Sequence, residues 1–205
     1  MNMVCLDLEG VLVPEIWIAF SEATGIAELR RTTRDEPDYD KLMNFRLDIL
    51  KKNNLKLHDI QKVISAMDPL DGALEFANAL REKTQLVILS DTFEQFAKPL
   101  MKKLLWPTLL CNSLKVDADG NVTGYALRQS DGKKKAVMGF KSMNARIFAA
   151  GDSFNDLSMI REAHAGCLFR APQSIRENCS DLPCVDTFDD LFKKIEEFLT
   201  TSRTN

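Results

Sequence analysis

The stretch VCLDLEGVLVPEIW, residues 4–17, decides how the chain begins to fold. Apolar residues run into Asp7, Glu9 follows two positions later, and the pattern changes at Pro14. The apolar run predicts a short buried strand over residues 3–7, whereas Pro14 suits the first turn of a helix. Carboxylates at the end of a buried strand cost free energy unless a cation or hydrogen-bond donors meet them. The stretch therefore indicates a functional site as well as a strand.

Beyond this strand the apolar spacing becomes helical, and no strand is expected between residues 14 and 68. Strands and helices then alternate to the end of the chain. The expected helices are 14–25, 39–53, 58–66, the stretch PLDGALEFANALREK, 93–104, 133–143, 155–164 and 188–199. The expected strands are QLVILS, RIFAAGDS, GCLF and CVD, with a hairpin that closes at Asp119-Gly120.

This order of elements predicts the fold class and the domain organisation. Alternating strands and helices are typical of an α/β fold with an open parallel sheet. We expect residues 1–13 and 69–205 to form this core and residues 14–68 to form a small helical cap, inserted after the first strand.

Polar side chains follow three of the predicted strands directly. Asp7, Ser90 with Asp91, and Asp152 each come after an apolar run. In an open parallel sheet the carboxyl ends of the strands share one edge, where ligands bind, so these groups should converge. A single Asp after a strand is usually a turn or cap residue. Together the three ends suit phosphoryl transfer, with carboxylates as nucleophile and Mg²⁺ ligands.

The composition excludes several other classes of protein. The net charge is −3 with scattered basic residues, which argues against nucleic acid as a partner. No apolar run approaches a membrane span, and no leader with a long apolar segment is visible. The five cysteines form no C-x-x-C motif, which favours free thiols in the cytoplasm. A small-molecule substrate, and a monomer or homodimer, are the remaining expectations.

Four ordered motifs carry a family resemblance: DLEGV, LSDT, a lysine near 133, and GDSFND. They resemble the motifs of the haloacid-dehalogenase-like (HAD) phosphotransferases over the whole chain. Within that superfamily the chain is most similar to phosphoserine phosphatases, and among these to the ThrH-like branch that also phosphorylates homoserine. The resemblance implies a HAD-like Rossmannoid sheet, a helical cap, Mg²⁺ as cofactor, and a role in serine or threonine biosynthesis.

The resemblance also implies catalytic and metal-binding roles. Asp7 would be the nucleophile, and Asp7, Asp152 and the main-chain carbonyl of Glu9 would bind Mg²⁺. The side chain of Glu9, where most members have Asp, would act as general acid and then as base. Asn155 would bind substrate or phosphate, and Asp156 would hydrogen-bond the waters of the metal.

The same resemblance assigns the phosphate-binding residues. Ser90 would offer its hydroxyl to phosphate, and Asp91 its backbone N–H. The stretch GKKKAV offers three lysines, of which only one can normally reach the site because successive helical residues point about 100° apart. The family spacing favours Lys133 over Lys134 and Lys135.

Two cap residues match the positions that bind the ammonium and carboxylate groups of the amino-acid substrate in the family. Glu15 would hold the ammonium of phosphoserine, and Arg46 would grip its carboxylate with a planar fork. Homoserine has the same ammonium and carboxylate, so it could replace water as the phosphoryl acceptor. Without the resemblance, Arg46 would be interpreted as a helix-surface residue paired with Asp40 or Asp48.

Alternative functions remain open at this stage. The chain could be a HAD phosphatase of another small phosphomonoester, such as phosphoglycolate. It could also be a non-catalytic phospho-acceptor module, although such a module needs neither Glu9 nor a cap. Trp17 and Trp106 are interpreted as packing residues, and His58 and His164 as cap or surface residues.

Overall fold

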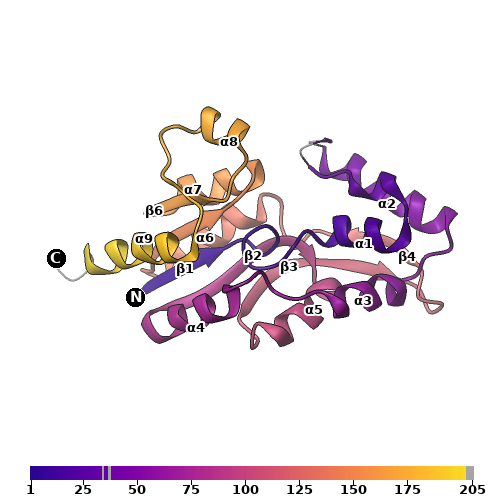
Figure 1. Ribbon diagram of the computed structural model, residues 1–205, viewed down its shortest axis with the longest axis horizontal. Helices are drawn as coiled ribbons and strands as arrows, with labels where there is room; N and C mark the ends of the chain where they lie inside the picture. The colour runs from indigo at the N-terminus through magenta and orange to yellow at the C-terminus, as the bar shows by residue number, and fades with distance from the viewer. Residues whose placement is uncertain (34, 37, 202–205) are drawn as a thin grey trace.

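A central, mostly parallel sheet organises the computed structural model, which describes residues 1–33, 35–36 and 38–201 (Figure 1). Its seven strands, counted over those residues, run in the order β4-β3-β2-β1-β5-β6-β7, and only β3 and β4 pair in antiparallel fashion. The strands are β1 (Asn2–Leu6), β2 (Gln85–Phe93), β3 (Thr108–Val116), β4 (Val122–Ala126), β5 (Arg146–Gly151), β6 (Ala165–Phe169) and β7 (Cys184–Val185). This confirms the predicted α/β class.

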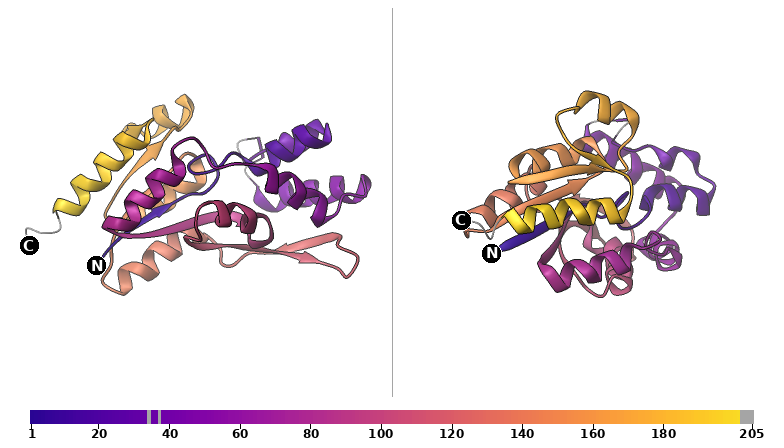
Figure 2. Two further views of the ribbon diagram at one scale, coloured as in Figure 1. Left: turned by 60° about the horizontal axis from the view of Figure 1, so that its bottom comes forward. Right: turned by 60° about the vertical axis from the view of Figure 1, so that its left-hand side comes forward.

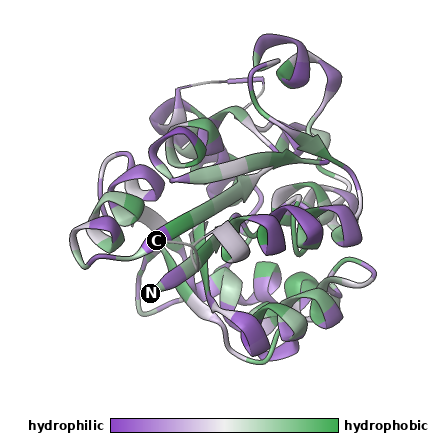
Figure 3. Cartoon of the chain, turned by 90° about the vertical axis from the view of Figure 1, so that its left-hand side faces the viewer, coloured by the Kyte–Doolittle hydropathy of each residue, from purple (hydrophilic) through white to green (hydrophobic). Residues whose placement is uncertain are grey.

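Helices cover both faces of the sheet, as the two views in Figure 2 show. The core helices are α4 (Ala73–Lys83), α5 (Glu94–Lys103), α6 (Gly132–Ser142), α7 (Leu157–Glu162), α8 (Gln173–Asn178) and α9 (Phe188–Thr201). On β1, Val4 and Leu6 face the core on the side of α4 and α9, and Met3 and Cys5 face the core on the side of α6 and α7. Buried strands with apolar residues on both faces are typical of a parallel sheet, and Figure 3 shows them in green between more hydrophilic helices.

The insertion after β1 is helical, as predicted, and lies at the end of the molecule away from both termini (Figure 1). It contains α1 (Ile16–Thr24), the 3₁₀ helix η1 (Ala27–Arg30), α2 (Tyr39–Lys52) and α3 (Leu57–Ala66). We call these elements the cap helices. They rest on the β3–β4 hairpin and on α5: the N–H of Leu57 donates to Gly120 O at 3.0 Å, and Gln61 Nε2 donates to Gln95 O at 3.0 Å.

Some local predictions were wrong. The first cap helix begins at Ile16, so Pro14 precedes it, because the carboxylate of Glu9 accepts the first N–H of the helix. The expected helix over 155–164 is split into the 3₁₀ helix η2 (Phe154–Asp156) and α7. Trp106 is 60% exposed and does not serve as a core packing residue. The short elements η1 and α8 were not predicted.

The hairpin prediction is confirmed. Strands β3 and β4 pair in antiparallel register, and the turn between them contains Gly120 with φ of +84°. A positive φ of this kind favours glycine. No helix of the described residues has the length and apolar content needed to cross a membrane.

Candidate active site

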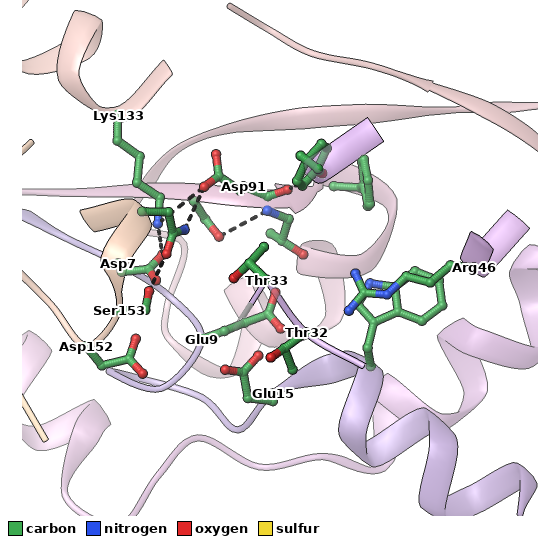
Figure 4. Close-up of a pocket in the computed structure, with 16 residues that line it drawn as sticks. Asp7, Glu9, Glu15, Thr32, Thr33, Arg46, Asp91, Lys133, Asp152 and Ser153 are labelled. Carbon is green, nitrogen blue, oxygen red and sulfur yellow. Dashed lines mark hydrogen bonds and ion pairs between the residues drawn. The ribbon is translucent and has the colours of Figure 1, made fainter. Parts of the chain in front are cut away.

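Nine of the ten residues to which the sequence analysis gives a site role line one cavity at the carboxyl edge of the sheet (Figure 4). They are Asp7, Glu9, Glu15, Arg46, Ser90, Asp91, Lys133, Asp152 and Asn155. The strands β1 and β5 pair up to Leu6 and Ala150, and the N–H of Asp7 extends this ladder to Ala150 O at 3.0 Å. Parallel pairing therefore brings the residues that follow the two strands together. In Figure 4 Asp7 and Asp152 lie at one end of the cavity and Arg46 lies at the other.

The carboxylate of Asp7 is buried and has one oxygen fixed by two donors. Its Oδ1 accepts the N–H of Leu8 at 2.8 Å and lies 2.9 Å from Lys133 Nζ. Burial, followed by the negative charge of Asp156, raises the pKa of Asp7 well above its usual range, and Lys133 opposes that rise. An arrangement that fixes one oxygen leaves Oδ2 as the reactive or metal-binding atom.

Lys133 is the lysine of GKKKAV that reaches this cluster. Besides Asp7, its Nζ contacts Asp156 Oδ1 at 2.6 Å and lies 3.7 Å from Asp91 Oδ2. These carboxylates raise the pKa of Lys133 well above its usual value against the cost of burial, so it remains a cation. Lys135 is exposed and donates to Ser130 Oγ at 2.8 Å instead.

Asp156 is fully buried and holds the cluster together. Its Oδ1 faces Lys133, while its Oδ2 accepts the N–H of Asp152 at 3.1 Å and the N–H of Ser153 at 3.0 Å. A Cβ on Gly151 would lie 2.2 Å from the Asp156 carboxyl carbon, so only glycine permits this approach. Both oxygens of Asp156 are thus used within the protein.

The cluster has the donor chemistry for a divalent cation. Asp7, Asp152 and Asp156 each offer an oxygen within 4.8 Å of the others, and all three are buried. When ionised, these three carboxylates outnumber the ammonium of Lys133, and Asp91, 3.7 Å from that ammonium, adds a further negative charge, so a Mg²⁺ ion would relieve the repulsion among them. Since Asp156 is already hydrogen-bonded through both oxygens, Asp7 and Asp152 are the better ligands. Gly10, with φ of +76°, lets the loop approach the Asp152 carboxylate to a distance that a Cβ would block.

The phosphate-binding candidates lie where β2 leaves the sheet ladder. Pairing of β2 with β3 jumps from Leu89 to Phe93, so residues 90–92 bulge toward the cavity. Ser90 is buried, and its Oγ accepts the N–H of Thr92 at 3.2 Å. A bulge of this kind turns backbone N–H groups away from the ladder, where an anion can accept them.

Glu9 lies between the two ends of the cavity (Figure 4). Its Oε2 accepts the N–H of Ile16 at 2.9 Å, which ties the loop after β1 to the start of α1. Burial, followed by the charge of Glu15, raises the pKa of Glu9 to about 7, against the lowering effect of the Ile16 and Thr92 hydrogen bonds. A carboxyl with this pKa can hold or release a proton near neutral pH.

Arg46 is a buried cation that forms no ion pair with the described residues, although the charges of Glu9 and Glu15 act on it. It is 7% exposed, its Nη2 donates to Arg31 O at 2.7 Å, and its guanidinium stacks 4.5 Å above the centre of the Trp17 ring. Its Nε has no hydrogen-bond partner, and the ion pairs of the described residues include none to Arg46. Burial lowers the pKa of Arg46 to about 10, which still leaves it charged at neutral pH. The surface pair with Asp40 is not formed, because Asp40 accepts from the Tyr125 hydroxyl.

The cavity also has lining residues that the sequence did not indicate: Trp17, Thr32, Thr33, Tyr39, Thr92, Phe93 and Ser153. The hydroxyl of Tyr39, from α2, donates to Asp91 O at 3.1 Å. Thr92 and Ser153 are the two that a motif could have revealed, because they lie within LSDT and GDSFND, and Phe93 directly follows the first of these motifs. The others depend on how the cap helices fold onto the core.

Comparison with known proteins identifies the family of the chain. The model of the haloacid dehalogenase-like hydrolases matches residues 12–161. The chain is 55% identical over 202 residues to "Phosphoserine phosphatase ThrH" of Pseudomonas aeruginosa, covering 98% of this chain and 97% of the relative. It is 56% identical over 201 residues to a phosphoserine phosphatase of Pseudomonas syringae pv. tomato, covering 98% and 84%.

Solved structures support the fold. A phospho-aspartyl intermediate analogue of phosphoserine phosphatase superposes with a TM-score of 0.72 at 20% identity, covering 94% of this chain and 97% of that one. A substrate-bound phosphoserine phosphatase complex gives a TM-score of 0.71 at 19% identity, covering 98% and 97%. At these identities the likeness concerns the arrangement of helices and strands.

Proposed function

We propose, because this chain belongs to the haloacid dehalogenase-like hydrolase family, that it is a Mg²⁺-dependent phosphoserine phosphatase that works through an aspartyl-phosphate. One observation carries the proposal. A single cavity has a buried carboxylate–lysine cluster at one end and, at the other, a buried arginine that no described residue meets in an ion pair. Phosphoserine has a phosphate at one end and a carboxylate at the other.

Asp7 is the proposed nucleophile. Its Oδ2 would attack phosphorus, the bond from phosphorus to the serine oxygen would break, and an aspartyl-phosphate would form. Lys133, 2.9 Å from the other oxygen, would counter the charge of the transferring group. Ser90, the N–H of Asp91, and Asn155 would orient the phosphate oxygens.

Glu9 is the proposed acid and base. With a pKa of about 7 it can carry the proton that the departing serine oxygen needs. Once that proton has been given up, the same carboxylate can accept a proton from the attacking water. Water attack breaks the bond between phosphorus and Asp7 and releases inorganic phosphate.

Mg²⁺ would be held by Asp7, Asp152 and the main-chain carbonyl of Glu9. When bound, it would supply positive charge to the phosphoryl oxygens. The excess of carboxylates over ammonium groups in the buried cluster supports this assignment. Asp156 would keep Lys133 and the Asp152 backbone in place through its four hydrogen bonds.

The cap would select the substrate. Residues 14–68 would form it, with 1–13 and 69–205 as the core, and Glu15 and Arg46 would bind the ammonium and carboxylate of phosphoserine. Arg46 is already buried and stacked on Trp17, so the cost of desolvating its guanidinium is met before the substrate binds. A substrate carboxylate can therefore form a strong ion pair with it. Homoserine carries the same two groups, so we propose it as a second phosphoryl acceptor, as the name ThrH of the 55% identical relative hints.

A screen of small phosphomonoesters tests both parts of the proposal. The full chain is incubated with Mg²⁺ and each ester, with and without homoserine, and phosphate and phosphohomoserine are measured. We expect phosphoserine to be the best substrate and homoserine to divert part of the phosphoryl group. Preference for phosphoglycolate would reject the substrate assignment, and inorganic phosphate as the sole product in the presence of homoserine would reject the transfer activity.

A further inference from the structure

The carboxylate of Asp91 lies at the end of the cavity where the proposed function places the phosphate of the substrate. Its Oδ2 accepts a hydrogen bond from Asn155 Nδ2 at 2.8 Å and lies 3.7 Å from Lys133 Nζ (Figure 4). These two donors are the ones that the proposed function assigns to phosphate. A carboxylate and a phosphate cannot both occupy them at full strength, because each ammonium or amide hydrogen serves one acceptor well.

Of the three acids around Lys133, Asp91 is held most loosely. The side chains of Asp7 and Asp156 are 8% and 0% exposed, and both lie within 2.9 Å of the ammonium. Asp91 is 41% exposed, and at 3.7 Å its oxygen is too distant for a good hydrogen bond to Lys133. The third N–H of the ammonium is therefore the one open to a ligand.

The backbone of Asp91 is fixed while its side chain has room to turn. Tyr39 Oη and Asn112 Nδ2 both donate to Asp91 O at 3.1 Å. The side chain also lines a second cavity of about 610 Å³, shared with Asn112, Lys133 and Asn155. Rotation about the side-chain torsions can carry the carboxylate from the phosphate end into that cavity without moving the backbone.

We propose that the Asp91 carboxylate is an internal competitor of phosphate. It holds Lys133 and Asn155 when no phosphoryl group is bound, turns into the adjoining cavity when one binds, and returns as inorganic phosphate leaves. Its charge weakens the binding of phosphate and speeds release of the product. This inference rests on the position of phosphate in the proposed function.

Binding of inorganic phosphate to Asp91→Asn tests the proposal. Asparagine keeps the acceptor for Asn155 and the backbone contacts, and removes only the charge. Calorimetric titration of the full chain with phosphate, in the presence of Mg²⁺, should give a Kd about tenfold lower than that of the unmodified protein, since unit charges a few ångströms apart repel strongly even when partly solvated. Asp91→Ala should also bind inorganic phosphate more tightly than the unmodified protein. This second variant tests the proposal if Asp91→Asn folds poorly.

Asp38→Asn is the matched control. Asp38 lines the same second cavity and caps α2 by accepting the N–H of Lys41, a role that asparagine fills equally well. Its contacts among the described residues include those with Lys41 and Glu36 and none with Lys133 or Asn155, so we expect the Kd to change by less than about twofold.

Several results would overturn the inference. Unchanged or weaker phosphate binding in both Asp91 variants, a gain no larger than that of Asp38→Asn, or no phosphate binding in any of the proteins would each do so. If phosphate binds and Asp91→Asn tightens it while phosphoserine is not hydrolysed, the inference stands and the proposed substrate fails.

Discussion

Replacing Arg46 with methionine separates recognition of the amino acid from phosphoryl chemistry. Methionine fills a similar volume in a buried site but has no charge. The guanidinium is buried and stacks on Trp17, and its Nε has no hydrogen-bond partner among the described residues. The charges of Glu9 and Glu15 act on Arg46, but the described residues form no ion pair with it, so a substrate carboxylate can take that place.

The size of the effect follows from that burial. Removing one partner of a buried, hydrogen-bonded charge pair costs about 2–5 kcal/mol. Such a loss lowers kcat/KM for phosphoserine by a factor of roughly 30 to several thousand. A substrate without a carboxylate, such as p-nitrophenyl phosphate, never forms the pair, so its turnover should change by less than about threefold.

The free energy of unfolding should change little in Arg46→Met. The variant loses the hydrogen bond to Arg31 O and the stacking on Trp17. It also no longer buries a cation without a carboxylate partner, which is a stabilising change. Thermal melts therefore show whether a loss of activity comes from unfolding.

Steady-state kinetics on both substrates give the answer, with Arg31→Met as control. Arg31 is exposed and stacks on Phe45 outside the cavity, and its own carbonyl is retained in the variant. An equal loss of turnover on both substrates by Arg46→Met, at an unchanged melting temperature, would refute the assignment of Arg46 to the carboxylate.

Two further predictions concern the metal site and pH. Mg²⁺ at about a hundred times its Kd should raise the free energy of unfolding by ~2.7 kcal/mol. Asp152→Asn should lose most of this stabilisation by Mg²⁺, and in EDTA it should have a higher melting temperature than the unmodified protein. An undiminished stabilisation of Asp152→Asn by Mg²⁺ would exclude Asp152 as a ligand. Partial burial, then Lys141 and Arg146, lower the pKa of His164, whose neutral Nδ1 accepts the N–H of Ile147 at 3.0 Å. Because the unfolded chain then binds the proton more readily, stability should fall as the pH drops below about 6.5. His164→Asn should flatten that part of the profile of melting temperature against pH, and an identical slope would contradict the role.

The strand ends could be predicted from sequence because topology alone brings them together. Parallel pairing of β1 with β5 and β2 fixes where Asp7, Asp152 and residues 90–92 emerge, whatever the details of packing. The choice of Lys133 came from the family spacing, and the structure places its ammonium against Asp7.

The environment of Arg46 could not be predicted from sequence. Its burial depends on Trp17 from α1 and on a carbonyl fifteen residues away, and no local pattern records such contacts. The start of α1 was missed for a similar reason, since a carboxylate seven residues earlier takes its first N–H. Short elements such as η1 carry too few residues for a periodic signal.

Among the described residues, two hydrogen bonds join the cap helices to residues of the proposed site, and movement of the cap would affect the two differently. The bond from Ile16 N–H to Glu9 lies within the segment that joins β1 to α1, so it can persist when the more distant parts of the cap move. The bond from the Tyr39 hydroxyl to Asp91 O joins α2 to the end of β2, residues separated by 52 positions, and any opening between them must break it. If the cap moved, Glu9, the proposed acid and base, would therefore keep its hydrogen bond to Ile16, whereas Asp91 O would keep the donor Asn112 Nδ2 and lose the Tyr39 hydroxyl.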